Sequence, residues 1–168
     1  TIVFQGDSVT DAGRTRGEND GLGHGYPAMC AGVLKSLFPD YELTIYNRGI
    51  GGDEAQWVAW RFAADVTQLS PRLAIVCVGC NNLWLLDNNI DPETGDYKEE
   101  EVLKVIATIK EAFTKMLEEA KANGIELHYV NTRMENATQY LRDLTGGTGY
   151  DDVVCFAPVK PVVEQADD

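Results

Sequence analysis

Short apolar runs alternate with longer amphipathic segments along the whole chain. The runs that predict β-strands are residues 2–4, 43–46, 73–78, 125–130 and 153–156. The run at 73–78 is apolar throughout, as expected of a parallel strand with helices on both faces. Strands that alternate with helices in this way predict a single α/β domain over residues 1–168, with a parallel sheet of about five strands.

Four segments between these runs predict helices, at residues 26–38, 53–69, 99–121 and about 138–144. The expected apolar positions are Met29, Val33, Leu34 and Leu37 in the first helix, Trp57, Trp60 and Ala64 in the second, and Val102, Ile106, Ile109, Phe113, Met116, Leu117 and Ala120 in the third. Asp53 is the expected N-cap of the second helix. In the third helix the apolar positions predict the buried stripe, and Gly124 lies just past the end.

The chain of 168 residues carries 27 acidic and 14 basic residues, a formal net charge of -13. An acidic surface repels phosphate backbones and anionic lipid, so we expect neither nucleic acid nor a membrane as a partner. A small neutral or cationic substrate suits this charge better. No apolar run approaches the ~20 residues that span a bilayer, and no leader is visible, so the expected location is the cytoplasm.

The four cysteines, Cys30, Cys77, Cys80 and Cys155, are expected to be reduced and buried, because three of them lie within apolar segments. Cys77 and Cys80 have the spacing of a redox pair. Such pairs stand at a helix N-terminus, whereas Cys77 is expected inside a strand, which argues against that function. The sequence contains no glycine motif for nucleotides and no metal-ligand spacing, so we expect neither a cofactor nor a metal.

Three polar turns, at residues 6–14, 47–53 and 79–82, follow the first three predicted strands. Ligands bind beyond the carboxyl ends of parallel strands, so these turns are expected to meet at one edge of the sheet. Each turn also has a purely structural interpretation. The first would then be a helix cap, the second a tight crossing, and the asparagines of the third would serve only the turn.

Acyl transfer needs a hydroxyl nucleophile and donors that face the developing oxyanion. Ser8 lies in the first turn, whereas Ser36 falls in a predicted helix and Ser70 directly before a proline. Gly52 offers an unobstructed backbone N–H at the start of a helix, and Asn81 offers a side-chain amide. These residues supply both requirements of an acyl-transfer site.

The chain resembles the bacterial GDSL (SGNH) hydrolases in three blocks. Residues 4–14, FQGDSVTDAGR, closely match the first block; residues 47–52, NRGIGG, and 78–82, VGCNN, resemble the second and third. The resemblance implies a flavodoxin-like three-layer α/β/α sandwich and hydrolysis of acyl esters or carbohydrate acetyl esters. It also implies that Ser8 is the nucleophile, and that the N–H groups of Ser8 and Gly52 form the oxyanion hole with the Asn81 side chain.

Three departures from this family pattern are visible. Gly51 stands where the family usually has Ser and Asn82 where it usually has Asp, and both are expected to hold the turns. The Asp-x-x-His block, which supplies the general base in the family, does not occur in the sequence. A serine hydroxyl without a base is a weak nucleophile. His128 is expected within a strand, while His24 lies in a loop at the edge where Ser8 lies and could approach it.

Two hypotheses of different class follow. The first is a serine esterase whose last segment, with the base, is missing from this chain, so that the domain is C-terminally incomplete. The second is a non-catalytic member of the family that keeps the pocket to bind an acylated or sugar ligand. Both assign a small-molecule ligand to the same three turns, and both leave the oligomeric state open.

Overall fold

The computed structural model describes residues 1–86 and 89–125, which belong to the compact unit Thr1–Glu126. The strands are β1 (Ile2–Gly6), β2 (Ile45–Gly49) and β3 (Leu73–Cys77). The helices are α1 (Ser8–Asp11), α2 (Tyr26–Leu37), α3 (Ala55–Asp65), α4 (Cys80–Trp84) and α5 (Glu99–Ala122), with single 3-10 turns at Asn19–Gly21 and Thr67–Leu69. The predicted elements at 125–130, 138–144 and 153–156 lie outside the described residues, except for Ile125. These elements and the single domain over 1–168 stay predictions.

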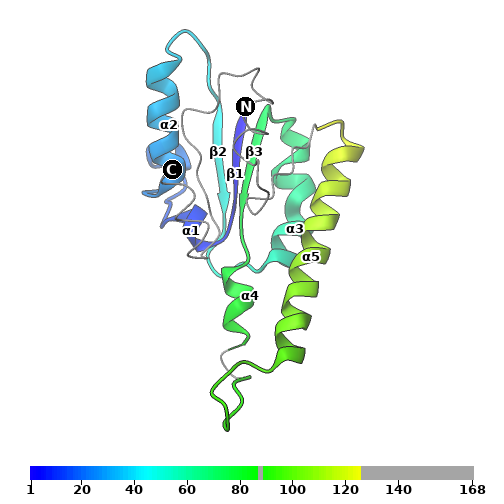
Figure 1. The fold of residues 1–168 in the computed structure, drawn as a ribbon. Coiled ribbons are helices and arrows are strands. Elements are labelled where there is room, and N and C mark those ends of the chain that lie inside the picture. The colour runs from blue at the N-terminus through cyan, green and yellow to red at the C-terminus, as the bar shows by residue number, and fades with distance from the viewer. Residues whose placement is uncertain (87–88, 126–168) are drawn as a thin grey trace, which may run out of the picture. The chain divides into compact units, whose positions relative to one another are not determined.

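The described strands form a parallel sheet in the order β2-β1-β3 (Figure 1). Gly6 at the end of β1 pairs with Gly49 of β2 and with Cys77 of β3, so all three strands end at one level. The predicted second strand was placed too early, because β2 starts at Ile45 and continues to Gly49. Three residues of the predicted turn at 47–53 are therefore strand residues, held by their pairing with β1.

Alternate residues of β1 enter two separate hydrophobic cores. Ile2 and Phe4 pack on the α2 side with Ala31 and Ile45. Val3 points to the other side, where it joins side chains of α3 and α5. Figure 1 shows α2 on one side of the sheet and α3 with α5 on the other. β1 is buried at every position because helices cover both of its faces.

The helix predicted at 53–69 is shorter than expected and begins differently. Its N-cap is Glu54, not Asp53, whose carboxylate instead pairs with Arg61 at 2.8 Å. The expected apolar positions Trp57 and Trp60 are 55% and 82% exposed. The buried face consists of Ala55, Val58 and Phe62. The prediction failed because the two indoles, although apolar, lie outside the stripe that contacts the sheet and α5.

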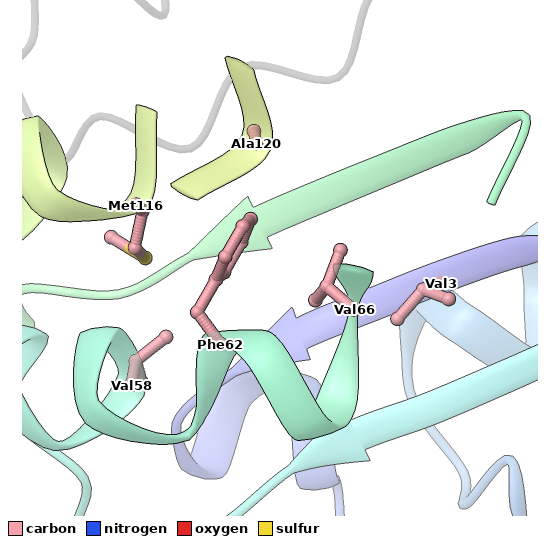
Figure 2. Close-up of a cluster of buried hydrophobic side chains, with 6 residues drawn as sticks. All are labelled: Val3, Val58, Phe62, Val66, Met116 and Ala120. Carbon is pink, nitrogen blue, oxygen red and sulfur yellow. The ribbon is translucent and has the colours of Figure 1, made fainter. Parts of the chain in front are cut away.

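The long helix was predicted almost to its bounds, and its expected buried residues Met116 and Ala120 are confirmed, but the rest of the buried stripe differs. The buried residues are Val105, Ala112, Met116 and Ala120, whereas the expected Ile106 and Leu117 are exposed. Two of the four buried residues are alanines, Ala112 and Ala120. Figure 2 shows Met116 and Ala120 of α5 gathered with Val58, Phe62 and Val66 from the α3 segment and Val3 of β1.

The face of α2 that contacts the sheet also differs from the expected one. Its fully buried residues are Pro27 and Ala31, and Leu34 is half-buried against the same core. Met29, Val33 and Leu37, which the spacing placed on the apolar face, are exposed in the described part of the chain. Size explains the difference, since α2 approaches the sheet through its small residues.

The core on the α3 side predicts a sharp contrast between two aromatic residues of one helix. Phe62→Ala should lower the free energy of unfolding by about 3–5 kcal/mol, because it removes a ring of α3 that packs against β1 and α5. Trp60→Ala, on the exposed face of the same helix, should change it by no more than about 0.5 kcal/mol. Urea unfolding measures both. Equal losses for the two variants would contradict this packing.

Candidate active site

The turns after the three strands converge because the strands are parallel and end together. The first turn connects β1 to α1, the second connects β2 to α3, and the third connects β3 to α4. The Ile50 N–H donates to the carbonyl oxygen of Gly6 at 3.0 Å, and the Asp7 N–H donates to that of Cys77 at 3.3 Å. These bonds extend the ladders of the sheet by one step into the turns.

Ser8 is the first residue of α1 and is exposed at this edge of the sheet. Asp7 is the N-cap, and its Oδ1 accepts from the Val9 N–H at 3.0 Å. The first N–H groups of a helix have no acceptor within that helix, so the Ser8 N–H remains a donor beside its own hydroxyl. No described side chain makes a hydrogen bond to the Ser8 hydroxyl. Ser8 thus offers a hydroxyl and an N–H that have no hydrogen-bond partner within the described part of the chain.

The second turn lies against Ser8. A Cβ added at Gly51 would stand 3.9 Å from the Ser8 Cβ and 3.8 Å from Oδ2 of Asp11. One residue further, Gly52 has a φ of +86°, a conformation that favours glycine. The Gly52 N–H donates to no acceptor within the described part of the chain, so it is available to a ligand.

The third turn contacts both of the others. The Asn81 side-chain amide donates to the carbonyl oxygen of Asp53 at 2.7 Å, which connects it to the second turn. The Cys80 thiol donates to Oδ2 of Asp7 at 3.1 Å, which connects it to the first. The three turns therefore contact one another pairwise. One N–H of the Asn81 amide is used by Asp53, and the second N–H of that group is left for another acceptor.

Asn82 holds the third turn against the start of α3, as expected of a residue that holds a turn. It is fully buried, its Oδ1 accepts from the Ala55 N–H at 2.9 Å, and its Nδ2 donates to Oε1 of Gln56 at 2.9 Å. Asn82 therefore caps the start of α3 from a different helix, α4. That short helix was missed from the sequence, where residues 79–82 read only as a turn.

Two largely buried arginines hold the ends of β1 and β2. Neither was expected from the sequence to have a function. Arg14 donates to the carbonyl oxygens of Asn47 and Gly49, each at 2.7 Å. Arg61 donates to the carbonyl oxygens of Arg48 at 2.7 Å and Gly6 at 3.0 Å. A partial signal was available, because each arginine lies three or four residues from an aspartate with which it pairs, Asp11 or Asp65.

The described histidine does not complete a catalytic pair. His24 is exposed, and its backbone N–H donates to the carbonyl oxygen of Ala12 at 3.2 Å. Within the described residues, no hydrogen bond joins its imidazole to Ser8. His128 lies outside the described residues. The structure thus brings together the three turns that carry Ser8, Gly52 and Asn81. In the part of the chain that it describes, it shows no base bonded to the Ser8 hydroxyl.

The described cysteines Cys30, Cys77 and Cys80 are free thiols, as predicted, although all three are only partly buried. Cys155 lies outside the described residues. Burial, followed by the charge of Asp7, raises the pKa of Cys77 to about 11. The pKa of Cys80 is raised by burial and by Asp7. A redox pair needs a thiol of lowered pKa, so these shifts argue against that function.

The model of the GDSL-like lipase/acylhydrolase family matches residues 4–165 of the sequence. The chain belongs to this family. The sequence blocks that resemble the family therefore coincide with the three turns that meet at Ser8. The flavodoxin-like α/β/α fold expected of a GDSL hydrolase is confirmed, and the described residues supply three strands of its parallel sheet.

Esterases that act on acetylated xylan are among the similar proteins. An acetylxylan esterase from Geobacillus stearothermophilus is 34% identical over 87 residues, which are 49% of this chain and 40% of that protein. The matched part thus spans less than half of that relative. The structure of a catalytic mutant of the acetylxylan esterase Axe2 from the same organism has a TM-score of 0.57 at 23% identity. The match covers 86% of this chain and 69% of the Axe2 chain, and it shows the fold alone.

A short segment is also similar to a protein with a different name. The mannitol-1-phosphate 5-dehydrogenase of Aliivibrio fischeri is 57% identical over 49 residues, 29% of this chain and 12% of that protein. A match to so small a part of a dehydrogenase does not assign its activity to this chain.

The described residues contain neither a membrane-spanning helix nor a cluster of metal ligands. No helix among residues 1–86 and 89–125 is both long and apolar enough to cross a membrane. In the same part of the chain, no group of three or more His, Cys, Asp or Glu side chains is placed to hold a metal ion.

The close approach of α1 to β2 predicts opposite effects of two glycine substitutions. A Cβ at Gly49 would overlap the Asp11 backbone nitrogen and lie 2.7 Å from the Thr10 carbonyl carbon, so Gly49→Ala should destabilise the protein by about 1–3 kcal/mol. Gly32, in α2, faces open space, and Gly32→Ala should stabilise it by about 0.5–1 kcal/mol. Denaturant unfolding compares them, and effects of the same sign would refute the contact.

Two weakly acidic side chains near the site, the thiol of Cys77 and the phenol of Tyr26, predict a loss of stability at alkaline pH. Burial raises the pKa of Cys77 from 9.0 to about 11 and that of Tyr26 from 10.0 to about 12. Between the ordinary and the raised pKa of each group, the unfolded chain releases a proton that the folded chain keeps. The free energy of unfolding therefore falls as pH rises from about 9 to about 12.

Urea unfolding of the wild type and of a Tyr26→Phe, Cys77→Ala double variant tests this expectation at about pH 8 and about pH 10.5. The double variant lacks both groups, so its stability should decline less between the two pH values. An equal decline in both proteins would show that other groups cause the alkaline loss.

Proposed function

We propose that this chain carries the acyl-transfer site of a serine esterase, in which Ser8 attacks the carbonyl carbon of a small acyl ester or a carbohydrate acetyl ester. The observation that carries the proposal is the pairwise contact of three turns around Ser8. Family membership gives the reaction class, and the local geometry supports the assignment of each group.

Oxyanion stabilisation is the best-supported part of the proposal. The Ser8 N–H at the start of α1, the Gly52 N–H and the Asn81 amide are three donors on neighbouring turns. Donors that are held in place before the reaction stabilise developing charge without reorganisation, and a single one is worth about 2.7–4 kcal/mol. The bond from Asn81 to Asp53 supports this role because it holds the amide in one orientation.

The proton of Ser8 needs an acceptor during the attack. The family supplies it from an Asp-x-x-His block, which is absent from these 168 residues. His24 is exposed and its imidazole is free of hydrogen bonds to described residues, so it is the candidate that the described part of the chain offers. Without a positioned base we expect slow acylation and slow deacylation, because general base catalysis contributes about 10²–10⁴-fold.

Two observations support an acetylated carbohydrate as the substrate class. The Geobacillus relative is an acetylxylan esterase. The formal charge of -13 suits a neutral substrate better than an anionic one. The proposal needs no metal or cofactor, since attack by a hydroxyl and binding of the oxyanion involve protein groups alone.

The second candidate is a binding protein that keeps the pocket without turnover. The observation that favours it is that no base is bonded to the Ser8 hydroxyl within residues 1–86 and 89–125. In this case the same three donors would bind a carbonyl or hydroxyl oxygen of an acylated or sugar ligand. The two candidates differ in one respect that can be measured, the formation of a covalent acyl group on Ser8.

Hydrolysis of p-nitrophenyl acetate by the 168-residue chain separates these candidates. We expect slow release of nitrophenolate and an acetylated Ser8 peptide in the mass spectrum, because deacylation also lacks a base. Ser8→Ala should abolish both signals. Ser36→Ala is the matched control, since Ser36 is an exposed serine of α2, and it should retain them. Equal release of nitrophenolate by the wild type and Ser8→Ala, with no acetyl group on Ser8 of the wild type, would reject the esterase.

A further inference from the structure

A thiol connects the third turn to the turn that carries Ser8. Cys80 is the first residue of α4, and its Sγ donates to Oδ2 of Asp7 at 3.1 Å. The other carboxylate oxygen, Oδ1, accepts from the Val9 N–H at 3.0 Å. Asp7 is 1% exposed, so its carboxylate is almost fully withdrawn from water and depends on protein donors.

We infer that Cys80 is a positioning residue for Ser8, because its thiol holds the Asp7 carboxylate that caps the helix on which Ser8 stands. The inference rests on the proposed function, in which Ser8 is the nucleophile. Cys80 acts through Asp7, to which its thiol is bonded.

The contact between Cys80 and Asp7 also fixes the position of Ser8 relative to the proposed oxyanion donor Asn81. Cys80 directly precedes Asn81, so the thiol fixes the start of α4 relative to the start of α1. A displacement of Asp7 would therefore change two things at once, the orientation of Ser8 and its distance from the Asn81 amide. Small displacements of reacting groups lower the rate strongly while ground-state binding changes little.

The thiol remains a donor at neutral pH. Burial first, and the adjacent Asp7 carboxylate second, raise the pKa of Cys80 above its ordinary value of 9.0, which keeps the proton on sulfur. Thiols are weak donors in general, but a charged and buried acceptor strengthens the bond. Cys77 does not have the same role, because its backbone carbonyl accepts a hydrogen bond from the Asp7 N–H, and no hydrogen bond within the described residues joins its thiol to the Asp7 carboxylate.

The test compares Cys80→Val, which removes the donor at similar size, with Cys80→Ser, which restores a hydroxyl donor. Cys30→Val, on α2, is the matched control for loss of a thiol elsewhere. Two quantities are measured on the 168-residue chain. One is the amide hydrogen-exchange rate of Val9 relative to that of Ala112, a core residue of α5 that reports global opening. The other is the Ser8-dependent hydrolysis of p-nitrophenyl acetate, as kcat and KM.

We expect Cys80→Val to raise the relative exchange rate of Val9 by about tenfold or more and to lower kcat by at least about tenfold, with KM unchanged. Cys80→Ser should recover most of both, and Cys30→Val should leave both unaltered. Unchanged exchange at Val9, or increased exchange with unchanged kcat, would overturn the inference. If the wild type shows no Ser8-dependent turnover, the esterase proposal fails, while exchange at Val9 still accepts or rejects the contact through Cys80.

Discussion

Backbone carbonyl groups at the ends of the parallel strands β1 and β2 need partners, and two guanidinium groups supply them. Arg14 bonds to the carbonyl oxygens of Asn47 and Gly49, and Arg61 bonds to those of Gly6 and Arg48. A buried carbonyl left unpaired costs about 1–3 kcal/mol, so these bonds matter for stability as well as position. Both arginines are also paired with carboxylates, so neither charge is buried alone.

The site depends on this arrangement because the first two turns begin where an arginine holds the end of a strand. Turns anchored only by their own sequence would move independently, and donors that must meet one oxygen atom would not stay aligned. Here the first turn is held by Arg14 through Asp11 and the second by Arg61 through Asp53. The third is held by contacts of α4 with its neighbours, Asn82 to α3 and Cys80 to Asp7. Rigid elements thus surround an exposed serine.

Much of the fold could be predicted from the sequence, because alternation of strand and helix is recorded in local hydrophobic patterns. β1, β3, α2 and α5 were placed within one or two residues, and the three turns were located. Contacts between distant residues were not accessible in the same way. Nothing in the local pattern showed that Asp53 pairs with Arg61 instead of capping α3, or that Asn82 caps a helix other than its own. Trp57 and Trp60 were assigned to an apolar face because hydrophobicity alone does not reveal which side of a helix meets its neighbours.

The central claim is that Ser8, Gly52 and Asn81 form one acyl-transfer site. It is tested most directly by a crystal structure of the chain after reaction with a small alkyl fluorophosphonate, in which the Ser8 oxygen would displace fluoride. The phosphonyl oxygen of this adduct stands where the oxyanion would be. We expect an adduct on Ser8 whose phosphonyl oxygen accepts hydrogen bonds from the Ser8 N–H, the Gly52 N–H and the Asn81 amide. An adduct whose oxygen points away from Gly52 and Asn81, or modification of another serine in place of Ser8, would contradict it.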